Sequence, residues 1–273
     1  MNVLKMEKKK QVLNALVEGC SARSISRMND IDRGTVLRVL VQAGNQCQSL
    51  LDNKVKNFHS QFIELDEIWT FCKKKEKTLT ENEKATGLFG DQYCFVAMDA
   101  KSKLVSNHHL GKRTLENTLK FIFDLKDKLK NNGRIQLTSD GFKPYIEAIE
   151  MAFGCDVDFA QLIKVFSADT PTGKYSPPKI SGIISKIFSG KPNIKNICTS
   201  YVERQNLTMR MQMRRFTRLT NGFSKKLENL KAALALHFAH YNFMRIHGTL
   251  RCTPAMEAGI TGHIWTWEEV LAY

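Results

Sequence analysis

The chain has 273 residues and carries 41 lysines and arginines against 27 aspartates and glutamates, a formal net charge of +14. This excess favours a polyanionic partner, either nucleic acid or an anionic membrane surface. The sequence has no run of about 18 apolar residues and no N-terminal signal peptide, which argues against a membrane role. The seven cysteines form no Cys-x-x-Cys pair, which argues against a zinc ribbon and predicts a cytoplasmic protein with reduced thiols.

Residues 1–45 have the pattern of a small unit of three helices. The apolar spacing predicts helices over 7–18 and 22–28, and Asp32 is a suitable N-cap for a third. Two helices joined by a short polar turn form the helix-turn-helix pattern. The side chains expected to face DNA lie at the start of the third helix: Arg33, Thr35 and Arg38. A generic three-helix packing unit is the alternative.

A polar linker over 46–60 is expected to lead into a larger domain, 61–220. Branched and aromatic residues predict its strands, at 61–71, 93–99, 104–110, 135–139 and 157–166. Helices are predicted between the last three strands, over 111–130 and 144–151. This order describes an α/β fold, a mixed sheet that begins with an antiparallel meander and has flanking helices.

Three isolated acids occupy informative places in this order of elements. Asp66 stands in the middle of the first strand, Asp140 follows the fourth strand directly, and Glu203 lies on a predicted helix over 199–216. A buried carboxylate needs a partner or a metal. Two-metal phosphodiester chemistry requires a cluster of carboxylates that holds two Mg²⁺ ions, and we expect that Mn²⁺ can replace Mg²⁺ here.

Two neighbouring acids compete with Asp66 for this role. Side chains alternate along a strand, so Glu67 is expected on the opposite face from Asp66, whereas Glu64 shares its face. Glu64 therefore stays open as an alternative ligand.

The helix over 199–216 also carries Arg210 and Arg214, which follow Glu203 on one face and are predicted to contact the DNA backbone. A solvated salt-bridge face is the alternative. A basic insertion over 168–197 is expected before this helix. Residues 221–273 are expected to form a long helix, 223–245, and a tail that packs on the catalytic domain.

Three stretches carry a resemblance to a known family: LDEIW at 65–69, LTSDGFKPY at 137–145 and SYVERQNLTMR at 200–210. They resemble the DDE transposases of the smallest bacterial insertion sequences, the "insertion sequence one" family, and the closing stretch 241–265 is similar too. The resemblance implies a ribonuclease H-like catalytic domain in which Asp66, Asp140 and Glu203 bind the metal ions. Members of that family often carry a Cys-rich zinc finger ahead of the helix-turn-helix, and we expect end recognition without one here.

The resemblance also implies a function. We expect a DNA transposase that binds the terminal inverted repeats of its element, cleaves a phosphodiester bond and joins the freed 3′-OH to target DNA. Because two ends must be brought together, we expect a homodimer or a larger assembly on double-stranded DNA, in the nucleoid of a bacterial or archaeal cytoplasm. The alternatives are a catalytically silent DNA-binding protein and a stand-alone nuclease of the same fold.

Overall fold

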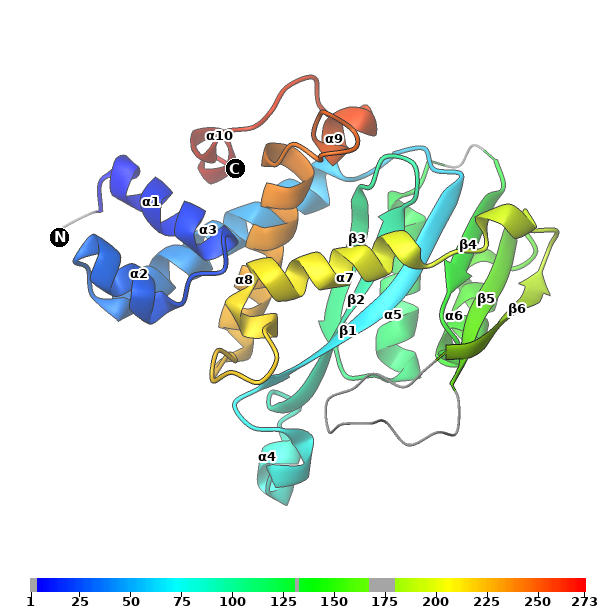
Figure 1. Ribbon diagram of the computed structural model, residues 1–273, viewed down its shortest axis with the longest axis horizontal. Coiled ribbons are helices and arrows are strands. Elements are labelled where there is room, and N and C mark those ends of the chain that lie inside the picture. The colour runs from blue at the N-terminus through cyan, green and yellow to red at the C-terminus, as the bar shows by residue number, and fades with distance from the viewer. Residues whose placement is uncertain (1–3, 131–132, 167–179) are drawn as a thin grey trace.

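A six-stranded mixed sheet forms the centre of the computed structural model, which describes residues 4–130, 133–166 and 180–273 (Figure 1). The strand order is β3-β2-β1-β4-β5-β6; β1 to β3 form an antiparallel meander, and β4 and β5 run parallel to β1. The strands are β1 (Phe62–Cys72), β2 (Gly90–Asp99), β3 (Val105–Gly111), β4 (Ile135–Ser139), β5 (Val157–Phe166) and β6 (Ile180–Ser189). The predicted fold class, an α/β ribonuclease H-like mixed sheet with flanking helices, is confirmed.

Helices cover both faces of this sheet. Helices α5 (Leu115–Lys128) and α6 (Pro144–Phe153) pack together behind it, and α7 (Ser200–Gln212) crosses its front over β1 and β2 (Figure 1). The apolar stripe of α5 is fully buried against the sheet, and Val202 and Met209 bury the inner side of α7. Burial of these stripes provides the main stabilisation of the layered arrangement.

The N-terminal helices are α1 (Met6–Val17), α2 (Ala22–Asn29) and α3 (Arg33–Lys54). Ser21 and Asp32 cap α2 and α3 through backbone N–H groups, as their positions before the helices predict. The three predicted helices are therefore present, and the division of the chain into domains stays a prediction.

The prediction of a linker over 46–60 is wrong for most of that stretch, because α3 continues to Lys54. Cys47, Leu50 and Leu51 form a buried stripe at helical spacing within an otherwise polar stretch. Helix α3 packs along α8 (Leu227–Ala239), and Gly44 allows close approach, since a Cβ there would lie 2.5 Å from the Cβ of Ala232. The stretch is thus a packed helix.

The basic insertion predicted over 168–197 contains a strand that its composition concealed. Residues 180–189 form β6, which pairs antiparallel with β5 at the edge of the sheet. Its β-branched isoleucines favour a strand, although the Gly, Ser and Lys residues between them had indicated a loop. Residues 168–179 of the predicted insertion lie outside the described residues.

Two predicted C-terminal helices are shorter than expected. Helix α7 ends at Gln212, and Arg214 lies in a short 3₁₀ turn, Arg214–Phe216. The long helix expected over 223–245 is α8, followed by a π-helical turn, His240–Met244. Among the described residues, none of the helices has the length and apolarity to cross a membrane.

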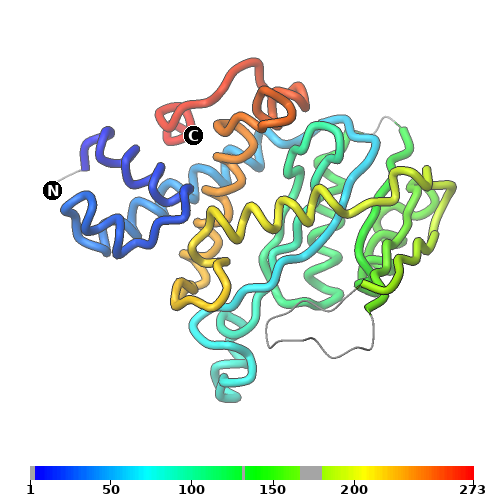
Figure 2. The backbone as a smooth tube through the Cα atoms, in the orientation of Figure 1, coloured from blue at the N-terminus to red at the C-terminus, as the bar shows by residue number. Residues whose placement is uncertain are grey.

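The remaining short elements lie in the excursion after β1 and in the tail: η1 (Glu76–Thr78), α4 (Glu81–Ala85), η2 (Ile194–Asn196), α9 (Pro254–Glu257) and α10 (Trp267–Leu271). The segment 221–273 was expected to pack on the catalytic domain. Phe238 and Asn242 do contact β3, through the ring of His108 and the backbone of Val105, whereas α10 packs on α3 and the indole of Trp267 donates a hydrogen bond to Asn14. Figure 2 shows the C-terminal end of the chain beside the N-terminal helices.

Candidate active site

The pairing of β1 with β4 brings two of the predicted acids together. Leu65 is the register partner of Ser139 in this parallel pair, so the next residues, Asp66 and Asp140, emerge at neighbouring positions. Glu203 reaches the same place from the first turn of α7. All three side chains line one open pocket of about 660 Å³, together with Arg113 and Lys164. The structure therefore brings the three predicted acids into a single site.

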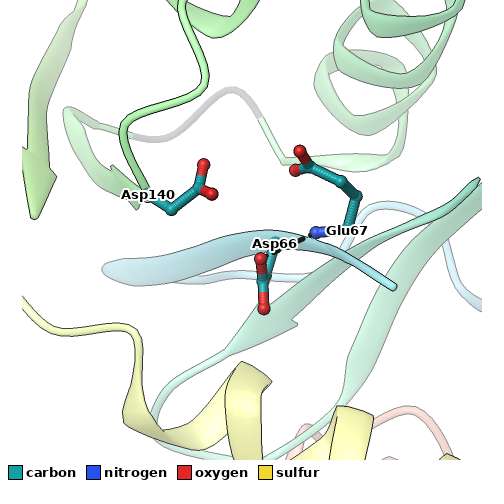
Figure 3. A group of neighbouring side chains, drawn as sticks. All are labelled: Asp66, Glu67 and Asp140. Atoms are coloured by element: carbon teal, nitrogen blue, oxygen red, sulfur yellow. Dashed lines mark hydrogen bonds between the residues drawn. The ribbon is translucent and has the colours of Figure 1, made fainter. Parts of the chain in front are cut away.

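The tightest group of carboxylates differs in one member from the predicted trio. Asp66, Glu67 and Asp140 each offer an oxygen, and these oxygens lie within 4.8 Å of one another (Figure 3). Asp66 and Glu67 leave β1 on opposite sides, as strand alternation predicts, with Asp140 facing the gap between them. Glu203 lies outside this group, although it lines the same pocket.

Asp66 is held by two hydrogen bonds. Its Oδ1 accepts from the backbone N–H of Glu67 at 2.9 Å, and its Oδ2 accepts from Nδ2 of Asn206 at 2.8 Å. Burial and the charges of Asp140 and Glu67 raise the pKa of Asp66 to about 7. The Oδ1 atom of Asn206 is buried and has no hydrogen-bond partner among the described residues. Sequence reasoning missed Asn206, although it follows Glu203 by three residues, on the same side of α7.

Arg113 connects the other two carboxylates of the group. Its guanidinium forms an ion pair with Oε1 of Glu67, with Nε at 2.5 Å, and its Nη2 lies 4.0 Å from Oδ2 of Asp140. The hydroxyl of Tyr145 donates to Oε2 of Glu67 at 3.2 Å. Burial and the charge of Asp140 raise the pKa of Glu67 to about 7, although Arg113 opposes this shift. Arg113, just before α5, was also missed from sequence because no pattern links it to Glu67.

Glu203 has one oxygen engaged and one available. Its Oε1 accepts from Nζ of Lys164 at 2.5 Å and from the hydroxyl of Thr199 at 2.7 Å. Among the described residues, its Oε2 accepts no hydrogen bond within this site. Lys164 comes from β5, so this ion pair connects the edge half of the sheet to α7.

Glu64, the open alternative to Asp66, has a different set of contacts. It is 3% exposed, and its Oε2 accepts from the backbone N–H groups of Tyr201 at 2.8 Å and Val202 at 2.9 Å. Burial raises the pKa of Glu64 to about 7, and these two hydrogen bonds oppose the shift. A carboxylate at this place satisfies N–H groups that the first turn of a helix leaves free. Glu64 therefore binds the start of α7 to β1.

Replacing Glu64 by Ala is expected to lower the free energy of unfolding by about 1–3 kcal/mol, because the buried N–H group of Val202 and the part-buried N–H group of Tyr201 lose their acceptor. Glu64→Gln keeps an acceptor oxygen and should cost less. Urea unfolding of both variants, beside Glu150→Ala on the exposed side of α6, measures the effect. Stability of Glu64→Ala equal to that of Glu150→Ala would contradict this role.

The predicted basic residues lie away from the acids. Nη1 of Arg210 donates to the carbonyl of Phe216 at 3.2 Å, and the side chain lines a separate pocket with Trp69 and Arg218. Burial and the charge of Arg218 lower the pKa of Arg210 to about 10. Because α7 ends at Gln212, Arg214 does not continue the predicted face. The expected arginine ladder beside Glu203 is therefore absent from the described acidic pocket.

The N-terminal candidates have open surroundings. Arg33 and Arg38 are exposed at the start of α3, and Nη2 of Arg38 donates to the hydroxyl of Thr35 at 2.7 Å. Their contact with DNA stays a prediction.

The chain has only low similarity to known proteins. No protein-family model matches the chain, and no curated protein matches it. Among solved structures it is similar to the Mos1 strand transfer complex, at 15% identity and a TM-score of 0.25, over 58% of this chain and 59% of that chain. It is also similar to the Mos1 mariner paired-end complex with Mn, at 14% identity and a TM-score of 0.24, over 57% and 60%. The chain thus spans about three fifths of the Mos1 chains it matches, and TM-scores this low transfer no residue's role.

Proposed function

We propose that this protein is a metal-dependent DNA transposase, which cleaves a phosphodiester bond at the end of its element and joins the freed 3′-OH to target DNA. The observation that carries the proposal is the convergence of Asp66, Asp140 and Glu203 on one open pocket. They come from the middle of β1, the end of β4 and the start of α7, in a chain with a net charge of +14. Carboxylates concentrated in a basic protein suit a metal site that must also admit a polyanion.

The donor set fits a hard divalent cation. Three carboxylates share one pocket, burial and the charges of Asp140 and Glu67 raise the pKa of Asp66, and the buried amide oxygen of Asn206 has no hydrogen-bond partner among the described residues. Oxygen-only ligands of this kind are those that Mg²⁺ and Mn²⁺ prefer. Asp66, Asp140 and Glu203 would hold two such ions, which when bound supply Lewis-acid activation of the attacking oxygen and stabilise charge on the leaving oxygen.

The chain's other residues position the substrate and the ligands. Asn206 donates to Asp66 and fixes the orientation of its carboxylate. Arg113 lies between Glu67 and Asp140, and holds their arrangement against mutual repulsion. Lys164, at the rim of the pocket beside Glu203, offers a cation to a phosphate oxygen of the entering strand.

The N-terminal helices would recognise the terminal inverted repeats. The exposed start of α3 presents Arg33 and Arg38 with no ion-pair partner among the described residues. A helix start of this kind can enter the major groove and read base edges. Two copies of the chain would be needed to hold two ends, so a dimer or larger assembly on DNA belongs to the proposal.

Incubation of the full chain with labelled duplexes that carry the DNA flanking its gene tests the function. In Mg²⁺ or Mn²⁺ we expect nicks that leave a 3′-OH, followed by joined products, and neither in EDTA. Nicks without joined products in any metal would favour the stand-alone nuclease. Specific binding without any nick would favour the silent DNA-binding protein.

A further inference from the structure

A second pocket lies on the other side of α7 from the acids. It has a volume of about 490 Å³ and is formed by the turn between β2 and β3, by α7, and by the segment 245–249 after the π-helical turn. Consecutive residues of α7 separate the two pockets, because Glu203 lines the acidic one and Arg204 lines this one. The start of α7 is thus a ridge between an acidic and a basic cavity.

The lining of the second pocket is cationic. Lys103, Arg204 and Arg245 line it, and no acidic side chain does. Arg204 and Arg245 are exposed and take part in no ion pair among the described residues. Positive charges gathered in a cavity that no carboxylate lines raise the local concentration of anions.

Lys103 is built into the pocket. Its Nζ donates to the carbonyl of Ala100 and lies 3.0 Å from the ring centroid of Tyr201. The carboxylates that face it are those of Glu64 and Asp99, and burial lowers its pKa. A lysine held between a carbonyl and a ring presents its charge at a fixed place, at little further cost in side-chain entropy.

The opposite wall leaves room and hydrogen-bonding capacity. Nδ1 of His247 is buried and has no hydrogen-bond partner among the described residues. A Cβ built at Gly248 meets no atom within 4 Å, so the backbone there borders open space. Thr208 and Thr249 add hydroxyl groups to the same lining.

We propose that this pocket binds a backbone phosphate of the DNA strand that enters the acidic pocket, so that the strand passes over the start of α7. Two exposed arginines and a fixed lysine match the fork and point-charge contacts that phosphates take from proteins. The open surroundings of both arginines suit a polymer that continues beyond the pocket. The inference rests on the proposed function, since it assigns a second contact to the same substrate strand.

A pair of variants at Gly248 tests the pocket without removing an arginine. Gly248→Glu places a carboxylate among the cations, whereas Gly248→Gln adds the same bulk without charge. We expect Gly248→Glu to weaken binding of a short fluorescent duplex in EDTA at least about tenfold and Gly248→Gln by less than about threefold, measured by anisotropy. Equal affinity of the two variants would overturn the proposal.

A second comparison, between two double variants, distinguishes the effect of the charges in the pocket from the effect of surface charge in general. Arg204→Gln/Arg245→Gln and Lys191→Gln/Lys195→Gln remove the same charge, but the two lysines are exposed near the start of β5, away from both pockets. The arginine pair should lower the slope of log affinity against log salt by about 1 for each phosphate that the variant no longer binds, and the lysine pair should leave it nearly unchanged. Equal slopes for both pairs would also overturn the proposal.

Cleavage by the unaltered chain separates failure of this inference from failure of the proposed function. If the chain cleaves DNA but all four variants bind alike, the pocket is not a phosphate site and the proposed function stands. If the chain never cleaves but the pocket variants bind more weakly as stated, the phosphate site stands and the proposed function fails. Melting temperatures within a few degrees of the parent confirm that each variant is folded.

Discussion

Asp66→Asn is expected to abolish metal-dependent cleavage, with a loss of about 10³-fold or more, because several kcal/mol of transition-state stabilisation disappear with a metal ligand. Asparagine keeps the shape of the side chain. Of the two hydrogen bonds that Asp66 accepts from the described residues, the one from the backbone of Glu67 can persist and the one from Nδ2 of Asn206 must rearrange. Single-turnover cleavage of an end duplex in Mg²⁺ measures the loss. Asp127→Asn, on the exposed side of α5, removes the same charge and should cleave at the rate of the parent.

The same variant is expected to be more stable than the parent when metal is removed. The pKa of Asp66 rises from 3.8 to about 7 on folding, so the folded state holds a proton that the unfolded chain has released. The carboxyl therefore destabilises the fold increasingly as the pH rises from 3.8 to about 7, and this penalty is fully present above pH 7. In EDTA, Asp66→Asn should melt at a higher temperature than the parent at pH 8, and the difference should shrink as the pH falls.

Two results would contradict this account of Asp66. Cleavage by Asp66→Asn at the rate of Asp127→Asn would remove Asp66 from the chemistry. A melting temperature below that of the parent in EDTA at pH 8 would mean that the carboxylate stabilises the fold without a metal ion. The clustering of the carboxylates would then need no metal to explain it.

The parts of this site that follow from local sequence were predictable. Asp66 interrupts an apolar strand, and Asp140 follows a buried strand directly before Gly141, so strand patterns predicted that carboxylates of these two strands could lie side by side. Glu203 lies in the first turn of a helix whose start is evident from sequence. The places of the three acids in the predicted order of strands and helices were therefore sufficient to predict that they share one site.

The parts that depend on contacts distant in sequence were not predictable. Glu64 could not be separated from Asp66, because the N–H groups that it accepts from belong to α7. The ion pair between Arg113 and Glu67 joins two segments with no shared periodicity. The continuation of α3 to Lys54 could not be predicted either, because it depends on the packing of its buried stripe against α8, which is distant in sequence.

Glu203→Gln and Glu67→Gln are expected to separate the two carboxylates that compete for the third ligand position. Both oxygens of Glu67 are already engaged, one by Arg113 and the other by Tyr145. Glu203 shares one oxygen between Lys164 and Thr199, which leaves Oε2 available to a metal. We therefore expect Glu203→Gln to lower cleavage at least about 100-fold and Glu67→Gln to lower it less than about tenfold.

The two variants should also differ in a readout that does not depend on cleavage. A ligand that binds only the folded state raises the melting temperature by mass action, so Mn²⁺ should stabilise the parent and Glu67→Gln against heat. Glu203→Gln should lose most of this stabilisation, because a neutral amide is a poor ligand for a hard cation. The reverse pattern, with Glu67→Gln inactive and insensitive to Mn²⁺ while Glu203→Gln cleaves, would assign the metal to Asp66, Glu67 and Asp140. Glu203 would then be only the partner of Lys164 that fixes the start of α7 against β5.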